Sequence, residues 1–452
     1  MKMEMEKILQ QATGKVDSAE LFRIKSKTIP VNFEVNRLKS IDIAESEGQA
    51  LRIINQGRIG FASLSGSSLE SEEDTETMVE QALATSEFGA TAAFDFPEKN
   101  EVGPTTNSNL PEKVKIFDPK IVEKSIEEMV KIGEEILVKI KDFDRRLRSD
   151  VTIVKDISEI EYSNSRGGSF SYAKTAIAYS LMIQQVEDQD ILMIESSQAA
   201  AQDKLEVEEL VSEAIENFKW GEKVASLESG KMPVIFTPKA VLTLILPLII
   251  GLNGKMVWEK VSPLAEQQNK KLWSEQLSLY SEGLIDFALG SAPFDDEGVE
   301  MRRYPLVEEG EIKNFYYDLQ TAGLAGVEST GNGLREGISS PPGPGITNLV
   351  MKVGTIPFPE MVKDIKEGII IDQVLGLGQG NIISGAFSNN VQLGFKVENG
   401  KIVGRVKDVM IAGNALEELK NIVALGDRSE WVGGRFKFPH LYLKSLSVST
   451  KV

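Results

Sequence analysis

The chain of 452 residues lacks cysteine altogether and contains a single histidine, His440. Without thiols it forms no disulfide and supplies no cysteine nucleophile or thiolate metal ligand. One imidazole also excludes every metal site that takes two histidines from the same chain. The longest apolar run, residues 240–252, is shorter than the roughly 20 residues that a membrane-spanning helix needs. We therefore expect no membrane segment, and a cytoplasmic location is the default prediction.

Positive charge is also scarce in this chain. It has 50 Lys and Arg against 68 Asp and Glu, which gives a formal net charge of −18 at pH 7. A chain with this balance repels phosphate backbones, so direct binding to nucleic acid is not expected. Hydrophobic residues make up 41% of the chain, an ordinary fraction for a globular protein with large cores. The length predicts two or three domains.

The spacing of apolar residues divides the chain into two parts. Helical spacing, set between strand-like stretches with glycine turns, predicts helices at residues 3–13, 72–88, 119–141 and 205–219. The second part is rich in glycine and strands and has one very apolar helix at 239–252. Because strands and helices do not alternate regularly, a doubly wound parallel sheet is disfavoured. We predict an α+β fold with mainly antiparallel sheets and flanking helices, a first domain at 1–228 and a β-rich second domain at 229–452.

Local signals define several boundaries. Asp118 and Pro119 fit the N-cap and first position of the helix at 119–141, and Thr237 is expected to cap the apolar helix. Residues 96–110 are rich in Pro, Gly, Asn and Thr, which predicts a surface loop.

Three consecutive acids, Asp295, Asp296 and Glu297, form the first candidate site. Carboxylates alone are suitable ligands for Mg²⁺ or Ca²⁺, and paired carboxylates can perform acid–base catalysis. The favoured alternative is a solvated turn that leads into a strand at 299–307. A hairpin turn at 308–311 and a second strand at 312–319 would follow.

Two glycine-rich loops are the next candidates. Gly376, Gly378 and Gly380 have G-x-G-x-G spacing, whereas a dinucleotide-binding loop needs G-x-G-x-x-G at the start of a helix. A tight loop or bulge before a strand at 382–387 is therefore the favoured interpretation. The loop at 329–335 contains Gly331, Asn332 and Gly333, and either brings backbone N–H groups to a ligand or merely connects two elements.

His440 is expected on the more polar face of a late strand, together with Tyr442 and Lys444. A Ser-His-Asp triad would have to use this histidine, but the chain has no G-x-S-x-G elbow to supply the serine. A structural role for His440 is therefore favoured.

Taken in order, these loops resemble the TldD/PmbA family, whose members are also called modulators of DNA gyrase and are classed among metallopeptidases. The resemblance is carried by residues 48–53, 57–62, 293–299, 329–333, 376–380, 397–402 and 411–414. It implies a two-domain α+β fold and a dimer with an enclosed cavity that admits unfolded peptides. In the catalytic branch of the family, a helix with the motif H-E-x-x-x-H and a later Cys bind Zn²⁺, and the Glu activates water.

Carried onto this chain, the resemblance places the two histidine positions at Ile245 and Ile250 and the base at Leu246. The cysteine position falls near residues 425–432, where no cysteine occurs. The zinc site of the family therefore cannot form in this subunit. The pattern resembles the PmbA branch, also called TldE, which accompanies a catalytic TldD subunit.

We therefore expect a non-catalytic PmbA/TldE-like subunit with no metal or cofactor of its own. It would bind unfolded peptides, and it would pair with a zinc-bearing TldD-like partner or with a second copy of itself. The residues expected to face the substrate are Asp295, Glu297, Gly331, Asn332, Gly333, Gly376, Gly378 and Gly380. Two alternatives remain open: a stand-alone hydrolase that uses Asp295 and Glu297, and an acidic protein that interacts with gyrase.

Overall fold

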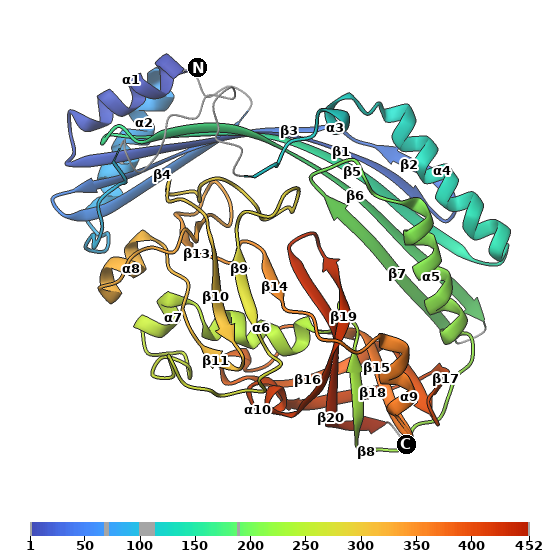
Figure 1. Ribbon diagram of the computed structural model, residues 1–452. Coiled ribbons are helices and arrows are strands. Elements are labelled where there is room, and N and C mark those ends of the chain that lie inside the picture. Colours follow the sequence, from blue (N-terminus) through green and yellow to red (C-terminus); the bar gives the residue numbers. More distant parts are fainter. Residues whose placement is uncertain (1, 67–71, 99–113, 188–189, 451–452) are drawn as a thin grey trace.

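The computed structural model describes residues 2–66, 72–98, 114–187 and 190–450. It contains two large sheets with helices packed against them (Figure 1). Apart from two strand pairs, the pairing within both sheets is antiparallel, so the predicted α+β class is confirmed. The boundary after residue 228 stays a prediction. The predicted loop at 96–110 lies mostly outside the described residues.

The first sheet has the order β4-β3-β1-β5-β6-β7, and β2 pairs with β1. Its strands are β1 (Ser18–Glu34), β2 (Arg37–Ile41), β3 (Ala44–Asn55), β4 (Arg58–Gly66), β5 (Arg148–Asn164), β6 (Ser169–Glu187) and β7 (Asp190–Ala200). The long strands β1, β5 and β6 form a curved sheet whose inner face lies over the loops of the second half of the chain (Figure 1). This arrangement places β1 and β6 above residues 289–338.

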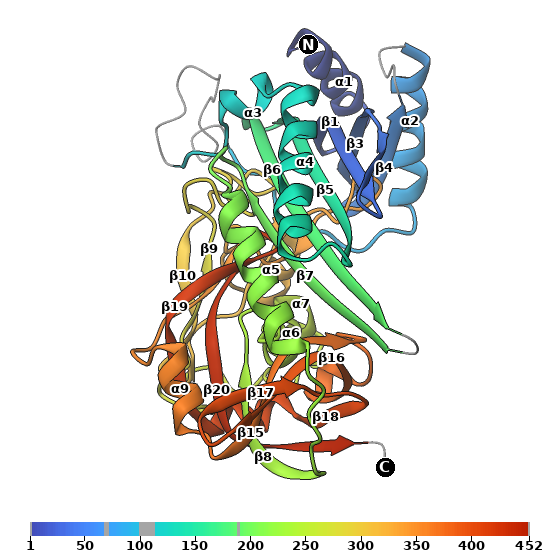
Figure 2. The same ribbon diagram turned by 90° about the vertical axis from the view of Figure 1, so that its right-hand side faces the viewer.

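Helices cover the outer face of the first sheet. α1 (Lys2–Thr13) packs on β1 and β5, and α2 (Glu72–Ser86) packs on β3 and β4. α4 (Ile126–Phe143) and α5 (Val207–Gly221) pack together over β5 to β7 (Figure 2). The predicted helix at 119–141 is in fact two helices, α3 (Pro119–Glu123) and α4. Asp118 and Pro119 begin the first as expected. Ser125 caps the second helix: its side chain accepts from the Glu128 amide, and the Glu128 side chain accepts from the Ser125 amide. This capping box satisfies two backbone donors at the start of a new helix, so the chain forms two helices at this point.

The second sheet has the order β11-β10-β9-β14-β20-β18-β16-β15-β8, with β17 on β16 and β19 on β20. The strands are β8 (Gly230–Phe236), β9 (Leu279–Glu282), β10 (Arg303–Glu308), β11 (Glu311–Ile312), β14 (Leu349–Met351), β15 (Glu367–Leu375), β16 (Ala386–Glu398), β17 (Lys401–Arg405), β18 (Val409–Asn414), β19 (Ile422–Val432) and β20 (Phe436–Thr450). A separate hairpin joins β12 (Gly333–Leu334) to β13 (Gly343–Pro344).

The helical segments of this half are short: α6 (Leu242–Gly251), α7 (Gly254–Trp258), α8 (Leu319–Ala325), α9 (Phe358–Asp364), α10 (Ala415–Glu418), and the 3₁₀ turns η1 (Ile382–Ser384) and η2 (Leu419–Asn421). α6 lies in the core of the second half, with Leu244, Ile245 and Leu248 fully buried. The described part of the chain has no helix with the length and apolar character of a membrane span.

Three predicted boundaries in this half are wrong. α6 begins at Leu242 and Thr237 does not cap it, because the Thr237 hydroxyl lies 3.5 Å from the carbonyl of Asp372 instead. The strand expected at 312–319 ends at Ile312, since Asp318 caps α8 by accepting a hydrogen bond from the Thr321 amide. The strand expected at 382–387 begins as η1, and β16 starts only at Ala386.

Candidate functional site

The acids at 295–297 lie beneath the first sheet, where the side chains of Asp295 and Glu297 are 0% exposed. The interpretation of this segment as a solvated turn is therefore wrong. Local sequence could not show this burial, because the groups that cover the turn are distant in the chain: Arg52 in the first half, and Leu319 and Gly333 in the second.

Two arginines and two glutamates meet at this point, and we call them the buried ionic cluster: Glu20, Arg52, Glu297 and Arg335. Arg52 of β3 donates from Nη1 to Oε1 of Glu297 at 2.7 Å. Its Nε also lies 2.8 Å from Oε1 of Glu20 on β1. Arg335 Nη2 reaches the same Glu20 oxygen at 3.0 Å. The cluster thus joins two strands of the first sheet to two loops of the second half.

Aromatic rings complete the surroundings of both guanidinium groups. Arg52 lies 4.7 Å from the ring centroid of Phe94 and 5.3 Å from that of Phe96, and Arg335 lies 5.0 Å from that of Phe22. Cation–π contacts of this kind strengthen when they are shielded from water. The rings therefore hold the cations in place and exclude solvent from the ion pairs.

Burial shifts the pKa values of three groups in the buried ionic cluster. It raises the pKa of Glu297 to about 7, and the positive charge of Arg52 opposes that shift. Burial alone would lower the pKa of Arg52, but Glu20 and Glu297 outweigh it and the pKa is raised. For Arg335 burial prevails, and its pKa is lowered. Arg52 is thus the main charge partner of both glutamates.

The carboxylate of Asp295 accepts hydrogen bonds from three backbone amides. Its Oδ1 accepts hydrogen bonds from the amides of Glu297 at 3.0 Å and Val299 at 2.9 Å, while Oδ2 accepts from the Gly333 amide at 2.8 Å. Glu297 Oε2 accepts from the Leu319 amide at 2.7 Å. Both carboxylates are buried and hydrogen-bonded within the protein, so in this conformation neither is accessible to a substrate. These contacts do not favour the alternative of a stand-alone hydrolase that uses Asp295 and Glu297.

The loop at 331–333 is also part of the interior. Asn332 donates to the carbonyl of Gly345 at 2.7 Å and accepts from the Tyr304 hydroxyl at 2.6 Å. Gly331 and Gly333 are buried, and the Gly333 carbonyl accepts from the amide of Asp296. The structure therefore brings Asp295, Glu297 and this loop together within a packed core; that they face a substrate stays a prediction.

Sequence reasoning missed Glu20, Arg52 and Arg335. A signal was present for Arg52, which stands in an otherwise apolar run between Ala50 and Ile54 in β3. A charged residue flanked on both sides by buried apolar residues needs a partner inside the protein. The identity of that partner depends on the tertiary structure, since Glu297 is 245 positions away.

The predicted motif positions lie on α6, and the predicted glycine loop at 376–380 packs against this helix. Leu246 lines a small space of about 10 Å³ together with Thr243, Pro247, Gly378 and neighbouring residues. Gly376, Gly378 and Gly380 all have positive φ angles, of 72°, 85° and 102°, which favour glycine. An added Cβ at Gly378 would lie 3.5 Å from Leu246 Cδ2. The predicted glycine loop therefore packs on the helix that carries the predicted motif positions.

His440 lies in β20 and stacks on Phe358, with ring centroids 4.3 Å apart. Burial lowers its pKa to about 4, against the weaker opposing effect of Asp427. Because the chain has one histidine, an NMR titration of the imidazole resonances reports on this residue alone. We expect a midpoint near pH 4. The unfolded chain takes up this proton near pH 6.5, so the free energy of unfolding falls as the pH drops from 6.5 towards 4. A midpoint above 6 would contradict the buried, stacked environment.

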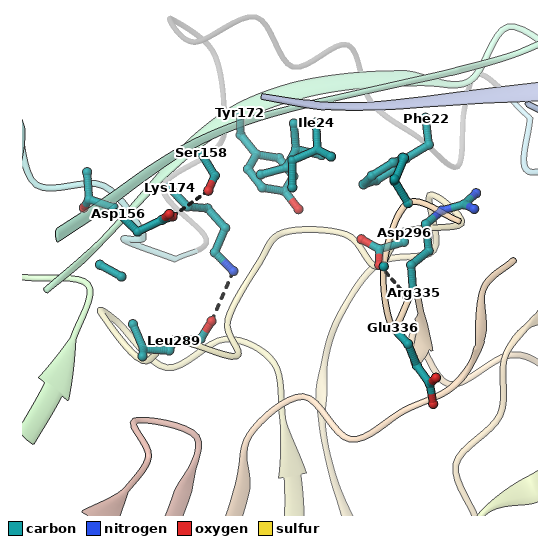
Figure 3. A pocket seen from close by; sticks show the side chains of 15 residues that line it. Phe22, Ile24, Asp156, Ser158, Tyr172, Lys174, Leu289, Asp296, Arg335 and Glu336 are labelled. Atoms are coloured by element: carbon teal, nitrogen blue, oxygen red, sulfur yellow. Dashed lines mark hydrogen bonds between the residues drawn. The ribbon is translucent and has the colours of Figure 1, made fainter. Parts of the chain in front are cut away.

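A cavity of about 440 Å³ lies beside the buried ionic cluster, between the inner face of the first sheet and the loops of the second half (Figure 3). Its polar lining includes Lys174, Tyr172, Asp156 and Asp296. Neither Lys174 nor Tyr172 belongs to a sequence motif. Both lie on β6 two positions apart, so they share one face of the sheet.

Two parts of this chain match models of known protein domains. The model of the PmbA/TldA metallopeptidase C-terminal domain matches residues 229–450, and that of PmbA/TldA metallopeptidase domain 1 matches residues 19–86. The chain belongs to the PmbA/TldD family. The two matches include β1 and β3 of the first sheet and all strands of the second.

Individual relatives and a solved structure agree with this assignment. The metalloprotease TldD homolog of Buchnera aphidicola is 34% identical over 177 residues, which are 39% of this chain and 36% of that relative. An uncharacterised protein of Methanocaldococcus jannaschii is 24% identical over 94% of this chain and 95% of its own length. The crystal structure of TldE from Thermococcus kodakarensis has a TM-score of 0.88 at 22% identity and covers 99% of this chain and 100% of its own. That last likeness shows a common fold.

The zinc site that the PmbA/TldD family implies does not fit the residues of this chain. Ile245, Leu246 and Ile250 have no atom that binds a metal, and the space beside Leu246 measures only about 10 Å³. Among the described residues, no group of three or more His, Cys, Asp or Glu side chains is arranged to hold a metal ion. No step of a metal-dependent reaction is therefore assigned to these positions.

Proposed function

We propose that this chain is a non-catalytic PmbA/TldE-like subunit that pairs with a zinc-bearing TldD-like metalloprotease and helps to form its peptide channel. The observation that carries the proposal is the apolar packing at Ile245, Leu246 and Ile250, the positions assigned to the zinc motif. Ile245 is fully buried in the core of the second half. The family scaffold is kept, while the positions that would perform hydrolysis serve the packing of the subunit.

The glycine loop at 376–380 is the surface that we assign to the peptide. Leu377, Gln379 and Gly380 are exposed, in contrast to the buried loop at 331–333. Extended peptides bind through backbone hydrogen bonds to open strand edges and loops, and glycines allow a close approach of the backbone. Gly376, Gly378 and Gly380 are therefore the better candidates for contact with a substrate.

The proposal is tested by expressing the chain alone, a TldD-like partner alone, and both together. We expect the two chains to co-purify, and we expect chelator-sensitive cleavage of an unfolded peptide to be strongest in the mixed sample. The isolated chain should show no cleavage above background at any zinc concentration. A second control, Gly378→Val in the mixed sample, should slow cleavage while the two chains still co-purify. Chelator-sensitive cleavage by the isolated chain would refute the proposal.

A further inference from the structure

The 440 Å³ cavity has walls from both halves of the chain. One wall is a face of three neighbouring strands, where Phe22 and Ile24 of β1, Asp156 and Ser158 of β5, and Tyr172 and Lys174 of β6 point the same way (Figure 3). Ile160 of β5 also lines this wall. The opposite wall contains Leu289, Asp296, Arg335 and Ile338. This volume lies within the range of small-molecule sites. None of these residues belongs to α6 or to the glycine loop at 376–380, so the cavity is separate from the family's metal position.

Some polar groups on the walls are already engaged. Arg335 is paired with Glu20, and the oxygens of Asp156 accept hydrogen bonds of 2.6 Å from the hydroxyls of Thr28 and Ser158. Asp156 therefore has little capacity left for a ligand, whereas the buried Nε of Arg335 has no hydrogen-bond partner within the described residues.

Besides the exposed Glu336, whose carboxylate points away from the sheet (Figure 3), three other groups keep hydrogen-bonding capacity. Lys174 donates once from Nζ, to the carbonyl of Leu289 at 3.2 Å, and an ammonium has three donors. Asp296 accepts from the Arg335 amide at Oδ2, at 2.7 Å, and its Oδ1 makes no hydrogen bond within the described residues. The Tyr172 hydroxyl, which points into the cavity, makes none there either (Figure 3). Figure 3 places the ammonium and this carboxylate on opposite sides of the cavity.

We propose that this cavity binds a small zwitterion with an apolar side chain, an α-amino acid or a dipeptide. The ligand's carboxylate would bind the Lys174 ammonium and the Tyr172 hydroxyl, and its ammonium would bind Asp296. Phe22, Ile24, Ile160 and Ile338 would contact the apolar side chain. A simple anion would bind Lys174 but leave Oδ1 of Asp296 without a hydrogen-bond donor, and a simple amine would do the reverse. A molecule that carries both charges satisfies both, because each buried charge gains a charge-assisted hydrogen bond.

Binding should depend on pH through Lys174. Burial lowers its pKa to about 8; Asp296 and Asp156 oppose this shift, and Arg435 reinforces it. The carboxylate of the ligand needs the protonated amine, so affinity falls as the pH rises through 8. Between pH 7 and pH 9 the protonated fraction of a group with this pKa falls about tenfold, and the affinity for L-leucine should fall by at least this factor. The fall for Leu-Leu should be larger, because the terminal ammonium of a peptide loses its own proton at about pH 8.

The test is isothermal titration of the full chain with L-leucine and with the dipeptide Leu-Leu. Isovalerate and isoamylamine, which keep the apolar part and one charge each, serve as probes. We expect saturable binding of leucine or Leu-Leu, about tenfold or more tighter than binding of either single-charge analogue, and weaker at pH 9 than at pH 7. Lys174→Met and Asp296→Asn should each weaken binding about tenfold or more, while the exposed control Lys141→Met should not.

The proposal is overturned if neither leucine nor Leu-Leu binds saturably, or if one single-charge analogue binds as tightly as the zwitterions. Binding that is unchanged in both cavity variants would also overturn it. If a variant does not fold, the comparison of analogues and the pH series on the unaltered chain still decide the matter. The measurement needs no partner subunit, so its outcome is independent of the proposed peptidase role.

Discussion

Replacing Arg52 by methionine is expected to lower the free energy of unfolding by about 3–5 kcal/mol, the usual cost of removing one partner from a buried ion pair. Arg52 is 2% exposed and contacts Glu20 and Glu297, both 0% exposed. Methionine preserves most of the side-chain volume, so the loss is mainly electrostatic. Two carboxylates would be left with one cation, Arg335, which reaches Glu20 alone.

Denaturant unfolding of the unaltered chain, Arg52→Met and the exposed control Arg37→Met measures this effect. The control should change stability by less than about 0.5 kcal/mol. Adding Glu297→Gln to Arg52→Met should recover part of the loss, because it removes one of the unpaired charges. A cost of Arg52→Met no larger than that of the control would show that the cluster does not stabilise the fold.

The same variant should respond to pH. Without Arg52, the pKa of Glu297 moves above its already raised value of about 7. A carboxyl whose folded-state pKa is raised contributes stability that is complete below its unfolded-state pKa and is lost as the pH rises through the folded-state pKa. The deficit of Arg52→Met should therefore be larger at pH 8 than at pH 5.5. A deficit that is constant across this range would indicate that packing, and not charge, dominates.

Replacing Gly333 by alanine is expected to cost about 3 kcal/mol, near the upper end of the range for overpacking a core. A Cβ at this position would lie 2.1 Å from Oε2 and 2.5 Å from Cδ of Glu297. The carboxylate cannot move away freely, because one oxygen binds Arg52 and the other accepts from the Leu319 amide. The substitution would therefore disturb the buried ionic cluster as well as the hairpin of β12 and β13.

Gly343→Ala is the matched control for this substitution. Gly343 faces Leu334 in the same hairpin, and an added Cβ there meets no atom within 4 Å. Alanine at 343 should leave the midpoint of thermal unfolding nearly unchanged, whereas alanine at 333 should lower it by several degrees. Equal midpoints for the two variants would contradict the close approach of Glu297 to residue 333.

Elements with a strong one-sided apolar pattern could be predicted from the sequence. The helices at 3–13, 72–88 and 205–219 correspond to α1, α2 and α5, which each bury one face against the first sheet. Errors arose where polar side chains end or begin an element. Ser125 and Asp318 cap new helices at positions where apolar spacing alone indicated continuation.

The candidate site could be predicted only in part, for a related reason. The resemblance to a family placed Leu246 at the motif position, and the structure puts it against the glycine loop. The acids at 295–297 were found, but their surroundings were not, because Glu20 and Arg52 lie more than 200 positions earlier in the chain. Lys174 and Tyr172 carry no local signal, since alternating polar and apolar residues are ordinary in a strand.

The position of β20 has a consequence for the order of folding. This strand, the last in the described chain, pairs with β8, β14, β18 and β19. The first sheet uses strands between residues 18 and 200 and can assemble early during synthesis, since domains generally fold as the chain emerges from its N-terminal end. The second sheet has to wait for its central strand. Until residues 436–450 are made, the second sheet is incomplete. Arg52 and Glu20 would then lie on the inner face of the folded first sheet, exposed to solvent and without the packed loops that carry Glu297 and Arg335.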